Sequence, residues 1–257
     1  MKQVFLLLGA ATIAFASCKK DGHKGGIFKG PVAKFQHGSA WTWIETDGDN
    51  KPERVGISID DAAMNSLDPG TEGEGGHHHE NGLSLQFHPK ASITPFTHAL
   101  LDWNPHGHEP AGIYDKPHFD FHFYVIPESE RLAIPAYETD STGFLNYPAP
   151  GYMPGTYVPG PGGVPQMGTH WIDWTTPELN GQPFTQTFLY GSYNGKVAFY
   201  EPMITKAFID ANTSFERSFG VPAKFKVSGY YPTKMRILKA EGATHIILEG
   251  FVYRTQS

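Results

Sequence analysis

Cysteine is nearly absent from this chain, because among 257 residues it occurs once, at Cys18. A chain without a second cysteine forms no internal disulfide bond and offers no zinc–thiolate cluster. Beyond Cys18 there is also no cysteine nucleophile. Any metal ion held by the rest of the chain must therefore be bound by histidine, aspartate, glutamate or water.

Charged residues are scarce and show no positive excess. Lys, Arg, Asp and Glu make up 18% of the chain, and the formal net charge is -6. Proteins that bind nucleic acid carry basic patches, so no nucleic-acid partner is expected.

Long apolar runs are missing as well, apart from Val4–Phe15 near the amino terminus. This run is too short for a membrane span, which takes about twenty apolar residues. Preceded by Lys2 and followed by the small residues Ala16 and Ser17, it has the layout of a secretory signal.

The residues around Cys18 resemble a bacterial lipoprotein signal. The resemblance implies that residues 1–17 are a signal peptide, that Cys18 is lipidated, and that the polar residues 18–26 are a tether. The expected partner is the membrane, through the lipid on Cys18. The expected location is the bacterial cell envelope, at the outer membrane or a periplasmic face. A plain secretory signal with an unrelated cysteine is the alternative.

Glycine and proline are abundant, with 29 and 21 copies, and they favour short strands joined by turns. We predict a mostly β fold, a single-domain antiparallel sandwich or barrel with a few short helices, over residues 27–257. Its clearest element is a hairpin of residues 184–193 and 196–204. Asn194 and Gly195 between them supply the positive φ angles of a type I′ turn.

Alternation and turn signals place the other elements. Strands are expected at residues 32–36, 40–46, 54–59, 83–87, 96–103, 224–229, 235–240 and 244–254. Short helices are expected at residues 62–67, after a cap at Asp60 or Asp61, and at 127–131. Residues 204–219 are expected to form a strand and then a short helix beginning near Asn212 or Ser214.

The stretch 117–125 alternates aromatic and polar residues without a break. On a strand, one face would carry Phe119, Phe121, Phe123 and Val125, and the other would carry His118, Asp120, His122 and Tyr124. Aspartate is a poor strand former, and a face that merely met solvent would usually carry Thr, Lys, Glu or Ser. Two imidazoles flanking a carboxylate therefore predict a metal site or an acid/base site.

Strand spacing limits which of these residues share an ion. Side chains two residues apart lie about 7 Å from each other and can act together, whereas His118 and His122, about 13 Å apart, would both have to lean inward. Further ligands must come from other elements. We predict metal ligation by His108, His118, His122 and His170, with Asp120 and Glu201 as ligands or catalytic bases.

Glu201 is included because it stands among apolar residues on a predicted strand. Val197, Phe199 and Met203 are expected to share its face, and a buried carboxylate needs a hydrogen-bonding, charged or metal partner. Imidazole and carboxylate ligands suit a divalent transition metal such as zinc, iron or manganese. A small-molecule ligand is expected, and a homo-oligomer stays open.

Two further segments each have two interpretations. His77–His79 lies in a Gly-rich stretch, which is either a metal-binding tract or a solvated loop. Pro148–Pro165 is too rich in proline and glycine for a central strand or a helix, and is either a domain linker or a wall over a site.

Common catalytic motifs are missing from the sequence. There is no Gly-x-Ser-x-Gly elbow, no Gly-rich phosphate loop opening a helix, and no His-Glu-x-x-His.

Several longer strings resemble those of a known family. They are Asp102 to Pro105, Gly107 to Pro110 with Gly112 to Tyr114, Pro117 to Tyr124, Val164 to Trp171, and Phe199 to Met203. Through them, residues 28–254 resemble a family of secreted bacterial proteins described only as a domain of unknown function. The resemblance implies one β-rich extracytoplasmic domain, and it implies no reaction.

Two hypotheses follow. In the first, the protein holds a divalent metal and acts on a small molecule by metal-assisted hydrolase, lyase or isomerase chemistry. In the second, it is a non-catalytic binding or structural lipoprotein whose histidines and acids form a hydrogen-bonded network without metal.

Overall fold

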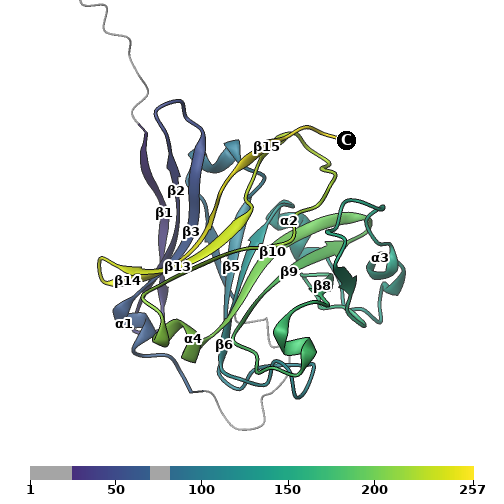
Figure 1. Ribbon diagram of the computed structural model, residues 1–257, viewed down its shortest axis with the longest axis horizontal. Helices are drawn as coiled ribbons and strands as arrows, with labels where there is room; N and C mark the ends of the chain where they lie inside the picture. Colours follow the sequence, from purple (N-terminus) through teal and green to yellow (C-terminus); the bar gives the residue numbers. More distant parts are fainter. Residues whose placement is uncertain (1–24, 70–81) are drawn as a thin grey trace, which may run out of the picture.

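The computed structural model describes residues 25–69 and 82–257, which form two antiparallel sheets packed face to face (Figure 1). The first sheet has the order β1 (Gly26–Phe35), β2 (Gly38–Thr46), β3 (Pro52–Asp60), β14 (Ala243–Glu249), β13 (Lys234–Ala240) and β11 (Ser214–Ser218). The second has the order β4 (Leu83–Gln86), β5 (His98–Asn104), β6 (His118–Tyr124), β10 (Lys196–Thr205), β9 (Gln186–Tyr193), β8 (Thr169–Asp173) and β7 (Tyr157–Pro159).

The remaining elements are small. A third sheet pairs β12 (Gly229–Tyr231) with β15 (Val252–Arg254). The helices are α1 (Asp61–Met64), α2 (Glu128–Leu132), α3 (Ser141–Leu145), α4 (Lys206–Ala211) and the 3-10 helices η2 (Pro89–Ile93) and η3 (Pro177–Asn180). Each large sheet ends in two edge strands, so the described residues form a sandwich and no closed barrel. Of the two predicted architectures, the sandwich is confirmed.

The inner faces of the two sheets meet in one apolar core. Ile44 and Ile57 of the first sheet are fully buried there with Phe119, Phe121 and Phe123 of β6. Burial of each such side chain stabilises the fold by roughly 1.5–3 kcal/mol. The predicted apolar face of β6 is therefore confirmed as the core face.

The outer face of β6 is covered too, and all seven residues of the strand are buried. One apolar cluster over this face includes Tyr124 and Phe199, and a second includes Phe184 and Met203. The polar side chains of β6 lie beside these clusters, away from solvent. They must therefore find their partners inside the protein.

Local signals explain several elements. Asn194 and Gly195 have φ angles of 47° and 76°, as the predicted type I′ turn between β9 and β10 requires. Asp60 caps α1 by accepting a hydrogen bond of 2.8 Å from the amide of Ala63.

Three predicted elements are wrong. In residues 204–219 the helix comes first, because Thr205 caps α4 by accepting from the amide of Phe208, and strand β11 follows. Residues 224–228 are irregular. Val227 is 64% exposed, so its side chain does not pack into the core as the predicted strand would require. Residues 244–254 form two strands, because the chain turns at Gly250, with φ of 67°.

The face predicted for β10 is also partly wrong. An irregularity in the pairing of β10 with β9 lies between Val197 and Phe199. As a result, Val197 packs against the core between the sheets, while Phe199 and Met203 belong to the clusters on the outer face. Glu201, between them in the strand, stays on the outer face.

Some predictions lie outside the described residues. They are the signal peptide 1–17, Cys18, the tether up to residue 24, and His77–His79. The tether was predicted to extend to residue 26, but Gly26 already belongs to β1. Within residues 25–69 and 82–257, no helix has the length and apolar character needed to cross a bilayer.

Gly191 on β9 provides a test of how the outer face is packed. It pairs with Phe199 on one side and His170 on the other, and a Cβ at Gly191 would lie 2.0 Å from Cε1 of Phe199. We expect Gly191→Ala to destabilise the protein by about 1–3 kcal/mol because the Phe199 ring must move. Thermal unfolding measures this.

The control is Gly155→Ala, since a Cβ at Gly155 meets nothing within 4 Å. Equal melting temperatures for the two variants would contradict the close packing of Phe199 over Gly191.

Candidate metal centres

All six predicted site residues lie on or over the outer face of the second sheet. Strand β6 carries His118, Asp120 and His122, β8 carries His170, β10 carries Glu201, and the β5–β6 loop carries His108. They form two groups: a first centre of His108, His118 and Asp120, and a second centre of His122, His170 and Glu201. Within each centre the ligand atoms lie within 4.8 Å of one another.

The expected four-histidine site is thus divided. His118 and His122 are four residues apart on a strand, about 13 Å, and neither has to lean toward the other because each finds its own partners. The division follows from the strand spacing, with ligands from other elements completing each centre.

The first centre is organised around the carboxylate of Asp120. His108 Nε2 lies 3.2 Å from Oδ2, and His118 Nε2 lies 3.2 Å from Oδ1. His118 and Asp120 are 0% and 1% exposed. Asn104 on β5 adds a hydrogen bond of 2.8 Å from its amide nitrogen to Oδ2.

Backbone carbonyls fix which ring nitrogen carries the proton in both histidines of the first centre. His118 Nδ1 lies 2.6 Å from the carbonyl oxygen of Lys116, and His108 Nδ1 lies 2.7 Å from that of Glu109. A carbonyl oxygen only accepts hydrogen bonds, so both Nδ1 atoms are donors. In the neutral rings, both Nε2 lone pairs therefore face the carboxylate.

Lone pairs that face a buried carboxylate require positive charge between them. For His118 and Asp120 the contact of 3.2 Å does not have the geometry of a hydrogen bond, and both His118 Nε2 and Asp120 Oδ1 are buried without one. A bound cation, or protonation of the rings, resolves the conflict.

The pKa values at this centre agree with that arrangement. Burial raises the pKa of Asp120, but the nearby His118 and His108 outweigh burial and hold that pKa well below its usual range. Burial lowers the pKa of His108, but the charge of Asp120 and the hydrogen bonds to Asp120 and Glu109, with a smaller effect of Asp102, together outweigh burial, so the His108 pKa is raised. Asp120 is therefore ionised and suited to bind a cation.

The second centre is organised around Glu201. His122 Nε2 lies 3.4 Å from Oε1 and His170 Nε2 lies 3.6 Å from Oε2. The other ring nitrogen of His122, Nδ1, lies 3.4 Å from Oδ2 of Asp102. A carboxylate on the far nitrogen of a ligating histidine is a common support of metal sites, because it fixes the ring and the tautomer.

Asp102 is a site residue that the sequence interpretation missed, apart from its place in a motif. It lies on β5 directly opposite Asp120 and is 5% exposed. The available signal was the polar alternation of Asp102 and Asn104 at the end of an apolar strand. That alternation puts both residues on the face occupied by His118 and Asp120.

Glu201 behaves differently from Asp120. Burial raises its pKa well above the usual range, and the negative charges of Asp120 and Asp102 raise it further. Burial and these charges therefore favour the protonated form of Glu201 when no cation is near. Cation binding at the second centre would release this proton.

The distances suit a metal ion. Bonds of about 2.0–2.1 Å in tetrahedral geometry place neighbouring ligand atoms roughly 3.3–3.4 Å apart. The histidine–carboxylate separations of 3.2 to 3.6 Å bracket that value, and the other ligand-atom pairs of each centre lie within 4.8 Å.

A cavity of about 330 Å³ adjoins both centres. His108 and Asp120 of the first centre and His170 of the second line it. Residues 160–164 form another part of the lining, so this portion of the Pro- and Gly-rich segment is a wall of the cavity, one of its two predicted roles. Ligand pockets of about 300–1,000 Å³ are usual, so the cavity fits a small molecule.

Tyr114 is a second residue that the sequence interpretation missed. Its side chain lines the cavity, and its hydroxyl is buried with no hydrogen-bond partner among the described residues. Burial, together with the charges of Glu178, Glu201 and Asp120, raises its pKa, so the hydroxyl stays neutral and can donate. Glu109 also lines the cavity and belongs to neither centre.

No family model, curated protein or solved structure matches this chain. The family resemblance suggested by the motifs therefore stays a prediction.

His98 lies on the same outer face but serves the fold. It stacks on Tyr124 with ring centroids 4.7 Å apart and belongs to neither centre. Burial lowers its pKa to about 4.

We expect the stability that neutral His98 contributes to depend on pH. Its folded-state pKa is below the unfolded value of about 6.5, so this stability is complete above about pH 6.5 and is lost as pH falls toward 4. The free energy of unfolding of the native protein should therefore fall by about 2 kcal/mol more between pH 7 and 4.5 than that of His98→Gln. Urea denaturation measures the difference, and parallel pH profiles would contradict it.

Proposed function

We propose that this protein binds divalent transition metal at the two centres and acts on a small molecule in the adjoining cavity, as a metal-assisted hydrolase, lyase or isomerase. The observation that carries the proposal is the first centre. There, the Nε2 atoms of His108 and His118 converge on the buried carboxylate of Asp120, with both Nδ1 atoms engaged by backbone carbonyls.

The ligand chemistry favours a transition metal over calcium or magnesium. Two imidazoles and one carboxylate in each centre suit zinc, iron or manganese, whereas calcium and magnesium prefer oxygen ligands alone. Asp120 would ligate at the first centre and Glu201 at the second, with Asp102 orienting His122.

Three protein ligands in each centre leave a coordination position for water or substrate, as catalytic sites do and closed structural sites do not. A divalent ion supplies Lewis-acid polarisation of a substrate oxygen and lowers the pKa of a coordinated water. Where only the first centre holds an ion, Glu201 would instead accept or return a proton, as its pKa changes with the charge nearby. Tyr114 would donate a hydrogen bond to the substrate.

The competing function is a metal-free, non-catalytic binding or structural protein. One observation favours it: the raised pKa of His108 allows a charged His108–Asp120 hydrogen bond without any metal. The two functions differ in metal content.

We expect protein purified without a His-tag to contain stoichiometric zinc, iron or manganese, or to take it up after dialysis. His118→Ala should abolish binding at the first centre only, and His170→Ala at the second only. Asp102→Asn should weaken the second centre by about 10- to 100-fold. Elemental analysis and metal titration measure these changes.

The control is His37→Ala, whose exposed side chain lies on neither centre. Cobalt substitution adds a second readout, because azide should shift the visible bands of an ion with an open position. Negligible metal after incubation with zinc, manganese and iron(II) would reject the proposal. Azide-insensitive bands would reject its catalytic part.

We further propose that the protein acts at the bacterial cell envelope, anchored by lipid on Cys18. The support is the short apolar run followed by Ala16, Ser17 and Cys18. We expect the mature protein to begin at an acylated Cys18 by mass spectrometry, and Cys18→Ser to move it from the membrane fraction to the soluble fraction. An unmodified cysteine in the mature protein would contradict the anchor.

A further inference from the structure

A second cavity, of about 440 Å³, lies at the end of the sandwich where β6 ends and β10 begins. It shares no lining residue with the cavity at the metal centres. Its lining comes from η2, the residues after β6, the start of β10 and the irregular segment that leads into β12.

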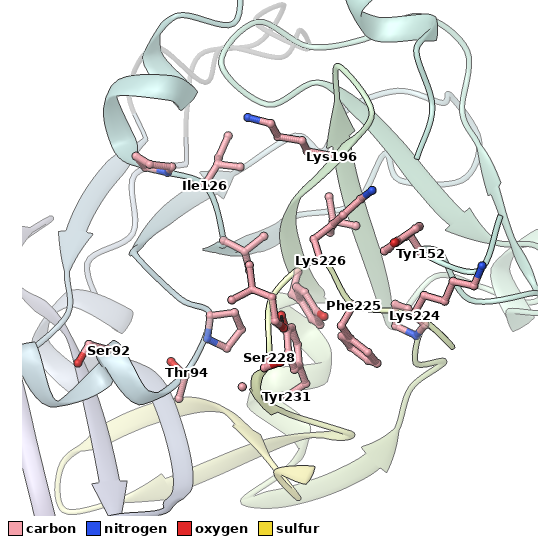
Figure 2. Close-up of a pocket in the computed structure, with 18 of the residues that line it drawn as sticks. Ser92, Thr94, Ile126, Tyr152, Lys196, Lys224, Phe225, Lys226, Ser228 and Tyr231 are labelled. Carbon is pink, nitrogen blue, oxygen red and sulfur yellow. Dashed lines mark hydrogen bonds between the residues drawn. The ribbon is translucent and has the colours of Figure 1, made fainter. Parts of the chain in front are cut away.

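The floor of this cavity is apolar. Phe225 and Tyr231 line it with ring centroids 4.3 Å apart (Figure 2). Tyr200 of β10 is a further lining residue. All three rings are buried members of the core between the sheets, and Val125 and Val197 pack against that core. The cavity is therefore an opening into the core, where an apolar chain would be removed from water.

The rim of the cavity is positively charged. Figure 2 shows Lys196, Lys224 and Lys226 around the cavity. Lys196 is matched by Glu130 at 2.7 Å. Lys224 and Lys226 make no ion pair with a carboxylate in the described part of the chain, and Lys226 lies 4.1 Å from the centre of the Tyr152 ring. Two unmatched ammonium groups thus stand beside an apolar floor.

Val227 is also at this rim, and it is 64% exposed. This exposed valine adds apolar surface at the rim of the cavity. The cavity therefore combines a place for a hydrocarbon chain with a place for a negative charge.

We propose that this cavity binds a medium-chain fatty acid, with its chain against Phe225, Tyr231 and Tyr200 and its carboxylate beside Lys224 and Lys226. The volume suits one small molecule, and the charge selects an anion over a neutral or cationic chain of the same length. The site is independent of the proposed metal chemistry, because the two cavities have separate walls.

The test uses dodecanoate, below its micelle concentration, titrated into the full-length protein by calorimetry. We expect saturable one-to-one binding, and at least a tenfold weaker binding to the double variant Lys224→Gln/Lys226→Gln. Dodecanol should bind the native and double-variant proteins equally. Val227→Asp should weaken dodecanoate selectively, because it places a carboxylate at the rim.

All three substituted side chains are exposed, so the variants should fold, and unchanged thermal unfolding would verify this. Lys34→Gln, at an exposed lysine on β1 away from the cavity, is the matched control and should bind as the native protein does. No saturable binding would overturn the proposal. So would binding that the double variant leaves unchanged or that Lys34→Gln weakens equally.

Discussion

The structure depends on one constraint: β6 is buried on both faces, yet one face is polar. Phe119, Phe121 and Phe123 give the inner face the packing of an ordinary sandwich. The outer face places His118, Asp120 and His122 out of contact with water, where each charge or lone pair needs a partner. The neighbouring strands and the β5–β6 loop supply those partners.

The two centres are electrostatically linked through that face. Asp102 and Asp120 are directly opposite each other on β5 and β6, and their negative charges contribute to the raised pKa of Glu201. Asp120 itself is held ionised by two histidines. The pKa values of two carboxyl groups near one cavity are therefore shifted in opposite directions by their surroundings, a common arrangement where one group ligates and another transfers protons.

Much of the fold followed from local signals. The strand alternation at residues 117–125, the Asn194-Gly195 turn and the Asp60 cap each depend on a few adjacent residues. The order of α4 and β11 did not follow, because the residues after Thr205 are equally compatible with a helix capped by Thr205 and with a strand. The register irregularity at Val197 also did not follow, since it depends on pairing with β9.

The site was predictable in its residues but not in its division. The six side chains were identifiable from residue type and alternation, whereas their grouping depends on which strands adjoin β6. Asp102 and Tyr114 were missed because one looked like the end of an apolar strand and the other like a core aromatic. The pairing of β5 with β6 places Asp102 beside His122, and the course of the β5–β6 loop places Tyr114 at the cavity.

The groups that hold the histidine rings differ between the two centres, and this affects which positions can change during evolution. At the first centre the rings are held by main-chain oxygens of Lys116 and Glu109, which every amino acid provides. Those two positions are therefore free to vary among descendants without loosening His118 or His108. At the second centre the ring of His122 is held by the side chain of Asp102. The residue type at position 102 is therefore restricted, whereas the residue types at positions 116 and 109 are not restricted in this way.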